Sequence, residues 1–443
     1  MSRWRSKHES DELVFAVCER FLRGERASSI ADWVKKAFDR PDFQRTQIYP
    51  LLGEGIRRQF FQLFPPLNWV LAQKIKETYD VGGGMKDPDP VTVVDLAYRG
   101  QTTGDSLGSD LHTHLTTVAA DVVVRLIEKV ARAKSSGKGP TLASAAPQKD
   151  LEGLDSRTPG SLNQKQSGYV EVHLGLGGGR TAMMVARTLA HRLMAQKNLP
   201  KLVIHTLSAG GFLPSEPQKS PVSYFSYFDG LPCPLEYVAL FSETVVSSDH
   251  FDLVRQNPSV RRVMERAEEL DIVVTSLASA EDEHGLLRRY LQWLVDSGDL
   301  PAKSIKAMKD AGWIGDVQFR PYSEKGPIPD LCGVRAVTLL EIEDMVKWSA
   351  WVHQPSASSL PASAPQNSNV TCSNVSPPQE PQNAGRKYVV LVAGPCAECG
   401  RLKTDALLPL LQNPNLRAFT HLVVDKATAN SLISAATGAS FDR

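Results

Sequence analysis

The feature that most constrains this chain is a repeated alternation of short β-rich runs with helical patterns between residues 169 and 436. Crossover helices that alternate with strands cover the faces of a largely parallel, doubly wound sheet. The sequence therefore predicts an α/β fold for the larger part of the chain. The β-rich runs lie at residues 169–174, 202–207, 237–241, 271–277, 334–339, 387–393 and 420–425.

A smaller helical domain is predicted ahead of this region, at residues 11–80. Two amphipathic helices come first, and a third apolar pattern covers residues 45–52. Gly53 predicts the end of that third helix, and residues 56–64 have the pattern of an extended ribbon. A last amphipathic helix follows at residues 67–79. Helix, helix, turn, helix and extended ribbon is the order of a winged helix-turn-helix.

The third helix of this domain carries side chains that commonly contact DNA bases and phosphates. Pro50 fits a helix only in its first turn, which requires the helix to begin near Thr46. The alternative for the whole domain is a helical interaction or dimerisation module with solvated charges. The candidate DNA-contacting residues are Arg45, Thr46, Gln47 and Tyr49 on the helix, with Arg57 and Arg58 on the wing.

Composition narrows the class of protein further. Lys and Arg number 50 against 49 Asp and Glu, so DNA contact requires a local basic patch. Polar tracts at residues 134–166 and 354–386 cannot bury enough apolar surface to offset chain entropy, and we expect both to be flexible insertions. No apolar run is long enough to span a membrane, and the six cysteines are sparse. These features predict a cytoplasmic protein.

A glycine-rich loop is the strongest local signal for a ligand. Gly175-Leu-Gly-Gly-Gly-Arg-Thr follows a strand and precedes a helix. Unpaired backbone amides at a helix N-terminus bind phosphate or carboxylate groups, and glycines let the backbone approach closely. The spacing matches neither the dinucleotide fingerprint nor the P-loop. The alternative is a tight turn between strand and helix with no ligand.

Two further polar residues border the same predicted edge of the sheet. Asp425 ends the strand at 420–425, and Lys403 begins the helix at 403–411. Open α/β sheets bind ligands beyond the carboxyl ends of their strands, which makes both residues candidates. The alternative for each is a helix cap or a surface charge.

Cys396 and Cys399 have the spacing of a metal or redox motif. A tetrahedral zinc site requires two more ligands. The nearest further cysteine, Cys372, lies in the second polar tract, and His421 stands alone in the sequence. The sequence therefore predicts no metal and no cofactor.

Taken in order, several stretches resemble the SorC family of bacterial sugar-responsive transcriptional regulators. The resemblance covers most of residues 11–80 and 100–436, apart from the two insertions. The sequence departs from the family at Ser276-Leu-Ala-Ser, where a Gly-Ile-Gly-like turn is usual, and in a longer loop at residues 396–401. The matching stretches are Ser29-Ile-Ala-Asp-Trp, Arg45-Thr-Gln-Ile-Tyr-Pro-Leu-Leu, the glycine loop, Ala311-Gly-Trp-Ile-Gly-Asp-Val and Val423-Val-Asp-Lys-Ala-Thr-Ala.

The resemblance implies a winged helix-turn-helix domain at residues 11–80. It also implies an effector domain at 100–436, whose fold is related to glucosamine-6-phosphate deaminase and ribose-5-phosphate isomerase. Such a protein is not an enzyme: it binds operator DNA as a homodimer or homotetramer, under the control of a phosphorylated sugar or related metabolite. The effector residues that it implies are Gly177, Gly178, Gly179, Arg180, Thr181 and Lys403, with Asp316 and Asp425.

Two other functions remain open at this stage. One is a sugar-phosphate isomerase or deaminase on the related fold, which would need a general base such as Asp316, Asp425 or Glu243. No catalytic triad or nucleophile-elbow motif supports that alternative. The other is a carbohydrate sensor that no longer binds DNA. A turnover assay distinguishes the first, and DNA binding across a salt series distinguishes the second.

Overall fold

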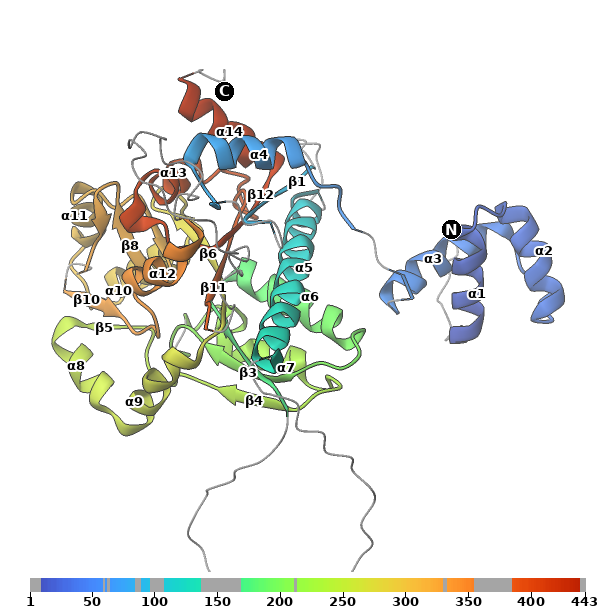
Figure 1. Ribbon diagram of the computed structural model, residues 1–443, viewed down its shortest axis with the longest axis horizontal. Coiled ribbons are helices and arrows are strands. Elements are labelled where there is room, and N and C mark those ends of the chain that lie inside the picture. The colour runs from blue at the N-terminus through green and yellow to red at the C-terminus, as the bar shows by residue number, and fades with distance from the viewer. Residues whose placement is uncertain are drawn as a thin grey trace, which may run out of the picture. The chain divides into compact units, whose positions relative to one another are not determined.

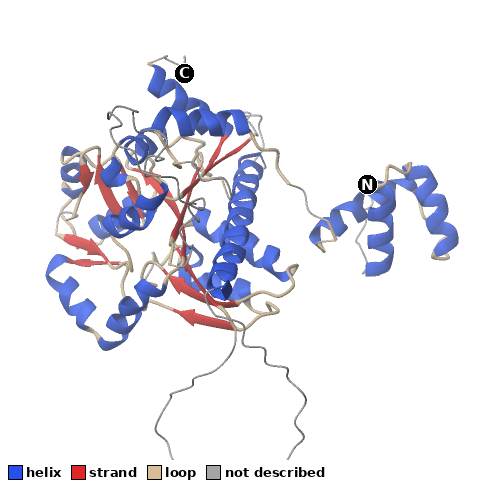
Figure 2. Cartoon of the chain, viewed as in Figure 1, coloured by secondary structure: helices blue, strands red, loops and turns tan. Residues whose placement is uncertain are grey.

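The computed structural model describes residues 9–438, except for residues 59, 62–63, 84–88, 96–106, 137–168, 211–212, 330–332 and 354–384. The chain divides into two compact units, Met1–Phe64 and Pro65–Arg443. Helices and strands of both are coloured along the chain in Figure 1 and by type in Figure 2.

The described residues of the first unit form a cluster of three helices, α1 (Asp11–Leu22), α2 (Ala27–Ala37) and α3 (Ile48–Arg57), with a 3-10 turn at Arg45–Gln47. Ser10 caps α1 by accepting a hydrogen bond from the Leu13 amide. The apolar faces of the helices meet in one small core, as their spacing predicts. That core includes Leu13, Val14, Val17, Ile30, Val34, Phe43, Ile48 and Leu51.

The structure corrects the end of the third helix. Gly53 does not end α3, which continues to Arg57, and residues 56–64 include no strand among those described. Gly55 lies where a Cβ would come within 2.3 Å of the Cys18 sulfur, so this glycine allows close packing of α3 on α1. Arg57 and Arg58 therefore lie at the end of a helix and not on a wing. Pro50 falls in the first turn of α3, where proline is tolerated.

The second unit contains a parallel sheet with the strand order β1-β12-β11-β6-β2-β3-β4. All of these neighbours pair in parallel. The chain proceeds from β2 to β3 and β4 in one direction, and β6, β11 and β12 extend the sheet in the other. The order therefore reverses between β2 and β6. The strands are β1 (Val91–Val94), β2 (Glu171–Leu176), β3 (Lys201–Thr206), β4 (Leu235–Val238), β6 (Ile272–Ser279), β11 (Tyr388–Ala393) and β12 (His421–Asp425).

Helices cover both faces of this sheet (Figure 1). One face packs against α5 (Leu107–Ser136) and α6 (Arg180–Met194), through residues such as Val123 and Leu189. The other face of the sheet packs against a second group of helices in a separate hydrophobic core. These helices are α4 (Trp69–Tyr79), α12 (Ile342–Ser349), α13 (Thr404–Gln412) and α14 (Lys426–Thr437). This arrangement confirms the predicted doubly wound α/β fold.

Helix α4, predicted as the last helix of the small domain, belongs to the second unit. The phenol of Tyr79 donates a hydrogen bond of 2.6 Å to the carbonyl of Leu432 in α14, and Ile75 is fully buried in the core under the sheet. The structure therefore places the boundary between the units near residue 64. The apolar stripe of an amphipathic helix predicts that the helix packs, but does not name its partner.

Several elements depart from the parallel pattern. The predicted strand at 334–339 is shortened to β10 (Val334–Ala336), which pairs in antiparallel fashion with β5 (Val245–Ser247) outside the main sheet. Composition marks a strand but does not specify its neighbour. An antiparallel extension of β6 is made by β7 (Gly315–Val317), β8 (Arg320–Ser323) and β9 (Gly326–Pro327).

The remaining helices connect the strands. They are α7 (Phe225–Phe228), α8 (Ser248–Gln256), α9 (Pro258–Glu265), α10 (Leu286–Asp296) and α11 (Ser304–Asp310), with 3-10 turns at Pro217–Lys219, Pro221–Tyr224, Arg266–Glu269, Ala350–Val352 and Pro414–Leu416. Among the helices that the structure describes, none combines the length and apolar character needed to cross a membrane.

The predicted insertions lie mostly outside the described residues. The first begins inside α5, because that helix continues to Ser136. Lys134 forms an ion pair of 2.6 Å with Asp271, which ties the end of the helix to the start of β6. Residues 137–166 and 354–384 are not described.

Candidate functional site

A pocket lies where the strand order reverses, beyond the carboxyl ends of β2 and β6. This is the position at which open α/β sheets bind ligands. Six of the eight predicted effector residues line it: Gly178, Gly179, Arg180, Thr181, Asp316 and Lys403. Folding thus brings together the glycine loop, the strand β7 and the start of α13, which are far apart in the sequence.

The glycine loop gives the pocket a helix N-terminus. Gly179 precedes α6 with a φ of 107°, a conformation that favours glycine. Its amide donates to the carbonyl of Lys219 at 3.0 Å, which fixes the glycine loop against the segment that follows β3. The first amides of α6, from Arg180 onwards, have no acceptor within the helix and carry partial positive charge. An anion in the pocket would meet these groups.

Gly177 does not line the pocket, but it contacts Gln318, which does. Its amide donates to the carbonyl of Val274, and a Cβ at this position would lie 1.8 Å from the amide nitrogen of Gln318. Gln318 in turn donates to the hydroxyl of Thr275 at 2.5 Å. Gln318 and Phe319 both have positive φ, of 55° and 61°, immediately after β7. Such strained turns occur at functional sites, and both of these residues line the pocket.

Three basic side chains converge on the carboxylate of Glu398 in this pocket. The Arg180 guanidinium lies 3.9 Å from it, the Lys219 ammonium 3.7 Å, and the imidazole Nε2 of His284 3.5 Å. Lys219 is 7% exposed and also pairs with Glu216. The pocket therefore contains a place where an anionic group is surrounded by donors from three segments of the chain.

Asp316 and Lys403 form a second polar part of the pocket. Asp316 is 6% exposed, and burial raises its pKa to about 7, although the Lys403 charge acts in the opposite direction. One carboxylate oxygen of Asp316 accepts no hydrogen bond from the described residues. The Lys403 ammonium donates to the carbonyl of Leu277 at 3.0 Å. A ligand hydroxyl is the kind of group that would satisfy the buried Asp316 oxygen.

Asp425 does not line the pocket. Its two carboxylate oxygens accept hydrogen bonds from the Ala427 amide and from the amide and hydroxyl of Thr428. These bonds satisfy the N-terminus of α14, so Asp425 acts as a helix cap, the alternative interpretation of its sequence position. Burial raises its pKa despite these bonds.

Sequence reasoning missed several residues of the pocket, because no local motif distinguishes them. They come from the segment after β3, the turn after β6, the turn after β7 and the loop between the two cysteines. The missed polar residues are Lys219, Asp282, His284, Gln318 and Glu398.

The predicted DNA-contacting residues fall into two groups. Arg45, Thr46 and Tyr49 are exposed on the 3-10 turn and the first turn of α3. Gln47 is half-buried, and its side chain accepts a hydrogen bond from the Gln44 amide at 2.7 Å, so it stabilises the turn. On the first unit taken by itself, Arg45, Thr46 and Tyr49 therefore form an exposed face that is accessible to a partner.

Arg58 is engaged inside the first unit. Its guanidinium pairs with Glu54 at 2.7 Å and with Asp11 at 2.6 Å, and it donates to the carbonyl of Glu9 at 2.7 Å. These contacts tie the end of α3 to the start of α1. Arg57 is exposed and pairs with Glu54. Of the two arginines placed on a wing by the sequence, Arg58 has a structural role.

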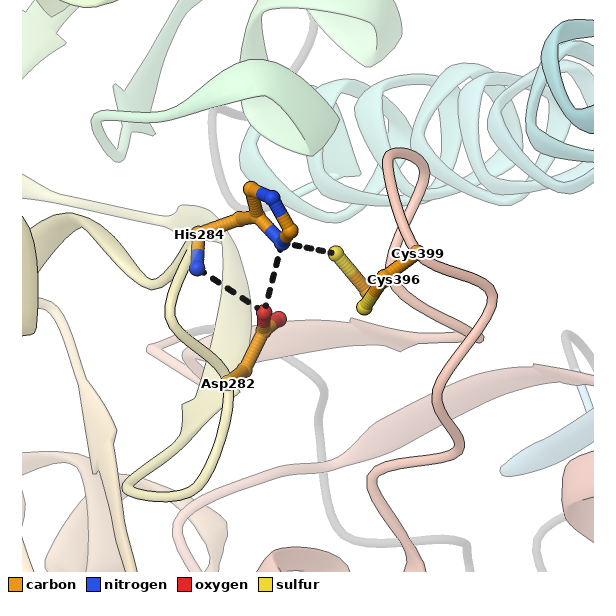
Figure 3. Close-up of side chains that lie close together, drawn as sticks. All are labelled: Asp282, His284, Cys396 and Cys399. Carbon is orange, nitrogen blue, oxygen red and sulfur yellow. Dashed lines mark hydrogen bonds and ion pairs between the residues drawn. The ribbon is translucent and has the colours of Figure 1, made fainter.

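The two cysteines of the 396–399 loop meet two further ligand-type side chains. Figure 3 shows Asp282 and His284, from the turn after β6, facing Cys396 and Cys399. One ligand atom of each residue lies within 4.8 Å of those of the others. Burial raises the pKa of the Cys396 thiol to about 11. The sequence showed no two further ligands for this pair, and the fold places an Asp and a His beside it.

The chain thus combines a unit of helices at residues 11–57 with an α/β unit that carries a pocket at the carboxyl edge of its parallel sheet. No family model and no curated protein matches the sequence. The structure is similar to the full-length sorbitol operon regulator SorC from Klebsiella pneumoniae, with a TM-score of 0.51 and 13% identity over 96% of this chain and 100% of that one. A transcriptional regulator from Streptococcus pneumoniae aligns with a TM-score of 0.47 and 13% identity, over 82% of this chain and 96% of that one. The mainly parallel α/β fold that the sequence resemblance implied for the larger unit is thereby confirmed.

Proposed function

We propose that this protein is a transcriptional regulator that binds DNA through its first unit and a phosphorylated sugar, or a related anionic carbohydrate, in the pocket beside α6. The observation that carries the proposal is the convergence of the α6 N-terminus with the side chains of Arg180, Lys219 and Lys403 in one pocket. Likeness of fold to a sorbitol operon regulator across both units supports the same assignment.

The pocket offers different chemistry for the two ends of such a ligand. A phosphate would take the place of the Glu398 carboxylate among Arg180, Lys219 and the first amides of α6. Sugar hydroxyls would donate to the buried, unpartnered side-chain oxygens of Asp316 and Gln318. Buried polar groups discriminate strongly against ligands that leave them unpaired, so this wall would select the carbohydrate.

On the DNA side, the exposed residues Arg45, Thr46 and Tyr49 are the proposed contacts, with Arg57 as an adjacent phosphate contact. Gln47 would reach DNA only by giving up its bond within the turn. Helix-turn-helix proteins commonly bind two half-sites about one DNA turn apart, so we propose a homodimer or a homotetramer. Effector and DNA would be linked by a coupling free energy of about 1–3 kcal/mol, equivalent to roughly 5- to 150-fold in affinity.

A thermal-shift series with glucose-6-phosphate, fructose-6-phosphate, glucosamine-6-phosphate and sorbitol-6-phosphate as probes tests the pocket. A ligand at 100 times its dissociation constant adds about 2.7 kcal/mol of stability. The double variant Arg180→Met/Lys403→Met should lose the shift, whereas Arg187→Met, an exposed position on the same helix, should keep it. A full shift in the double variant would contradict the pocket assignment.

The DNA half of the proposal is tested separately. Fluorescence anisotropy with genomic DNA fragments across a salt series should give a steep dependence on salt, because phosphate contacts release counterions. A selected fragment should then change its affinity when the active sugar phosphate is added. A ligand-responsive protein with no DNA affinity at low salt would instead be a sensor.

The protonation behaviour and position of Asp316 favour an enzyme as a second candidate function. The pKa of about 7 at Asp316 is suited to a general base, and the residue lies in the pocket beside Lys403. A sugar-phosphate isomerase or deaminase would use such a group. Incubation of the probe that binds, followed by product analysis, tests this second function. Turnover that is lost in Asp316→Asn would establish it.

A further inference from the structure

We propose that Asp282, His284, Cys396 and Cys399 form a binding site for a zinc-class divalent metal ion at the edge of the pocket. The inference goes beyond the proposed regulation and does not depend on it. Figure 3 shows the four side chains facing one another across two loops, one after β6 and the other after β11.

The spacing of the ligand atoms fits tetrahedral coordination. With metal–sulfur bonds of about 2.3 Å and metal–nitrogen and metal–oxygen bonds of about 2.1 Å, ligand atoms are separated by about 3.6 Å for nitrogen and sulfur and about 3.4 Å for nitrogen and oxygen. The Nδ1 atom of His284 lies 3.7 Å from the Cys396 sulfur and 3.3 Å from the Asp282 carboxylate. All four ligand atoms lie within 4.8 Å of one another. Two edges of the tetrahedron are therefore already close to their bound lengths.

The outer contacts of His284 also match those of a metal ligand. Its Nδ1 faces the cluster, while its Nε2 lies 3.5 Å from the carboxylate of Glu398. A histidine that binds a metal through one ring nitrogen commonly donates its other N–H to a carboxylate, which fixes the ring and its tautomer. Asp282 is held as well, because its carboxylate accepts a hydrogen bond of 3.0 Å from the His284 amide.

The cysteine loop is shaped to present sulfur. The Gly400 amide donates to the carbonyl of Cys396, and the Cys396 amide donates to the carbonyl of Arg401, both at 2.8 Å. Gly400 has a φ of 72°, so the chain turns back directly after Cys399. The loop therefore places both sulfur atoms beside Asp282 and His284.

The ligand types select the metal. Two thiolates, an imidazole and a carboxylate suit zinc. Magnesium and calcium require oxygen ligands, and iron–sulfur clusters are held by four cysteines or by two cysteines and two histidines. Four protein ligands correspond to a closed, structural site. Asp282, His284 and Cys396 also line the pocket, so the ion would fix part of its wall.

The test uses the full chain, purified in reducing buffer after growth with zinc. Mass spectrometry under native conditions should show one zinc ion per chain, removable by a chelator. The apo protein titrated with Co²⁺ should develop thiolate-to-cobalt charge-transfer absorption and the intense visible bands of tetrahedral cobalt. The double variant Cys396→Ser/Cys399→Ser should lose both signals, and His284→Gln should weaken binding by about 10-fold or more.

A matched control is the half-buried cysteine of the same unit, Cys233, which lies outside the cluster. Cys233→Ser should bind one zinc ion and keep the cobalt spectrum. Circular dichroism of each variant shows whether it folds, and the cobalt spectrum of the unaltered protein tests the site without any variant. A protein that binds no zinc, a cobalt spectrum that lacks thiolate bands, or a Cys396–Cys399 disulfide under these reducing conditions would overturn the proposal.

Discussion

The guanidinium of Arg180, in the first turn of α6, lies 3.9 Å from the carboxylate of Glu398, in the loop after β11. Lys219 lies 3.7 Å from the same carboxylate. An internal anion thus lies beside two cations in the wall of the pocket. A ligand phosphate would have to compete with this carboxylate.

Removing that competition should strengthen the binding of anions. In Glu398→Gln, we expect the affinity for a sugar phosphate that binds the wild-type protein to rise about two- to five-fold, because partly exposed ion pairs contribute about 0.2–1 kcal/mol each. Isothermal titration calorimetry measures the change. Glu283→Gln, at an exposed position outside the pocket, should leave the affinity unaltered. Weaker binding in Glu398→Gln would show that the carboxylate helps to hold the ligand.

The buried Asp316 should make stability depend on pH. Its pKa is raised to about 7, so the folded protein retains a proton that the unfolded chain releases near pH 4. Stability therefore falls as the pH rises from about 4 to about 7, where the unfolded chain binds fewer protons. Asp316→Asn removes this pH-dependent loss. The free energy of unfolding of Asp316→Asn, minus that of wild type, should therefore be larger at pH 8 than at pH 5 by about 1–3 kcal/mol.

Urea denaturation of both proteins at several pH values, in the same chelator-containing buffer, measures this difference. Asp310→Asn, outside the pocket, is the control. A constant difference between Asp316→Asn and wild type from pH 5 to pH 8 would mean that Asp316 is already ionised in the folded protein at acidic pH.

Gly177 should be intolerant of a side chain because of Gln318. A methyl group in Gly177→Ala would meet the Gln318 amide nitrogen and force it away from Thr275. We expect a loss of about 1–3 kcal/mol, as for other overpacked interiors. Adding Gln318→Ala should recover part of this loss, since the clash disappears. Denaturation of the two single variants and the double variant gives the coupling energy, and additive losses would contradict the contact.

The two arginines at opposite ends of the predicted DNA-binding segment should behave differently. Arg45→Gln should weaken DNA binding and reduce the slope of log affinity against log salt by about one for each chain that makes the contact. Arg58→Met should mainly increase hydrogen exchange in α1 and α3, because its partners are Asp11, Glu54 and the Glu9 carbonyl. Arg132→Gln, on α5, is the charge-matched control for DNA binding. Equal salt slopes for Arg45→Gln and wild type would remove Arg45 from the interface.

The sequence by itself determined the α/β fold and the position of the glycine loop. Strand and helix patterns depend on local periodicity, and the residues Gly178–Thr181 are adjacent in the chain, so both can be recognised without tertiary information. Lys403 was predicted from its position at the start of a helix beside the carboxyl edge of the sheet, whereas Asp316 came only from the resemblance to a known family.

Tertiary structure alone decided what surrounds that loop. In the sequence, Gly55 and Gly177 cannot be distinguished from glycines that end a helix or form a turn. In the structure, a side chain at Gly55 would clash with Cys18, and one at Gly177 would clash with Gln318. The Cys396–Cys399 pair lacked ligands in the sequence because Asp282 and His284 come from the turn after another strand. Parallel strands bring their carboxyl ends to one edge of the sheet whatever their separation in sequence, so the partners at that edge follow from the strand order and not from local pattern.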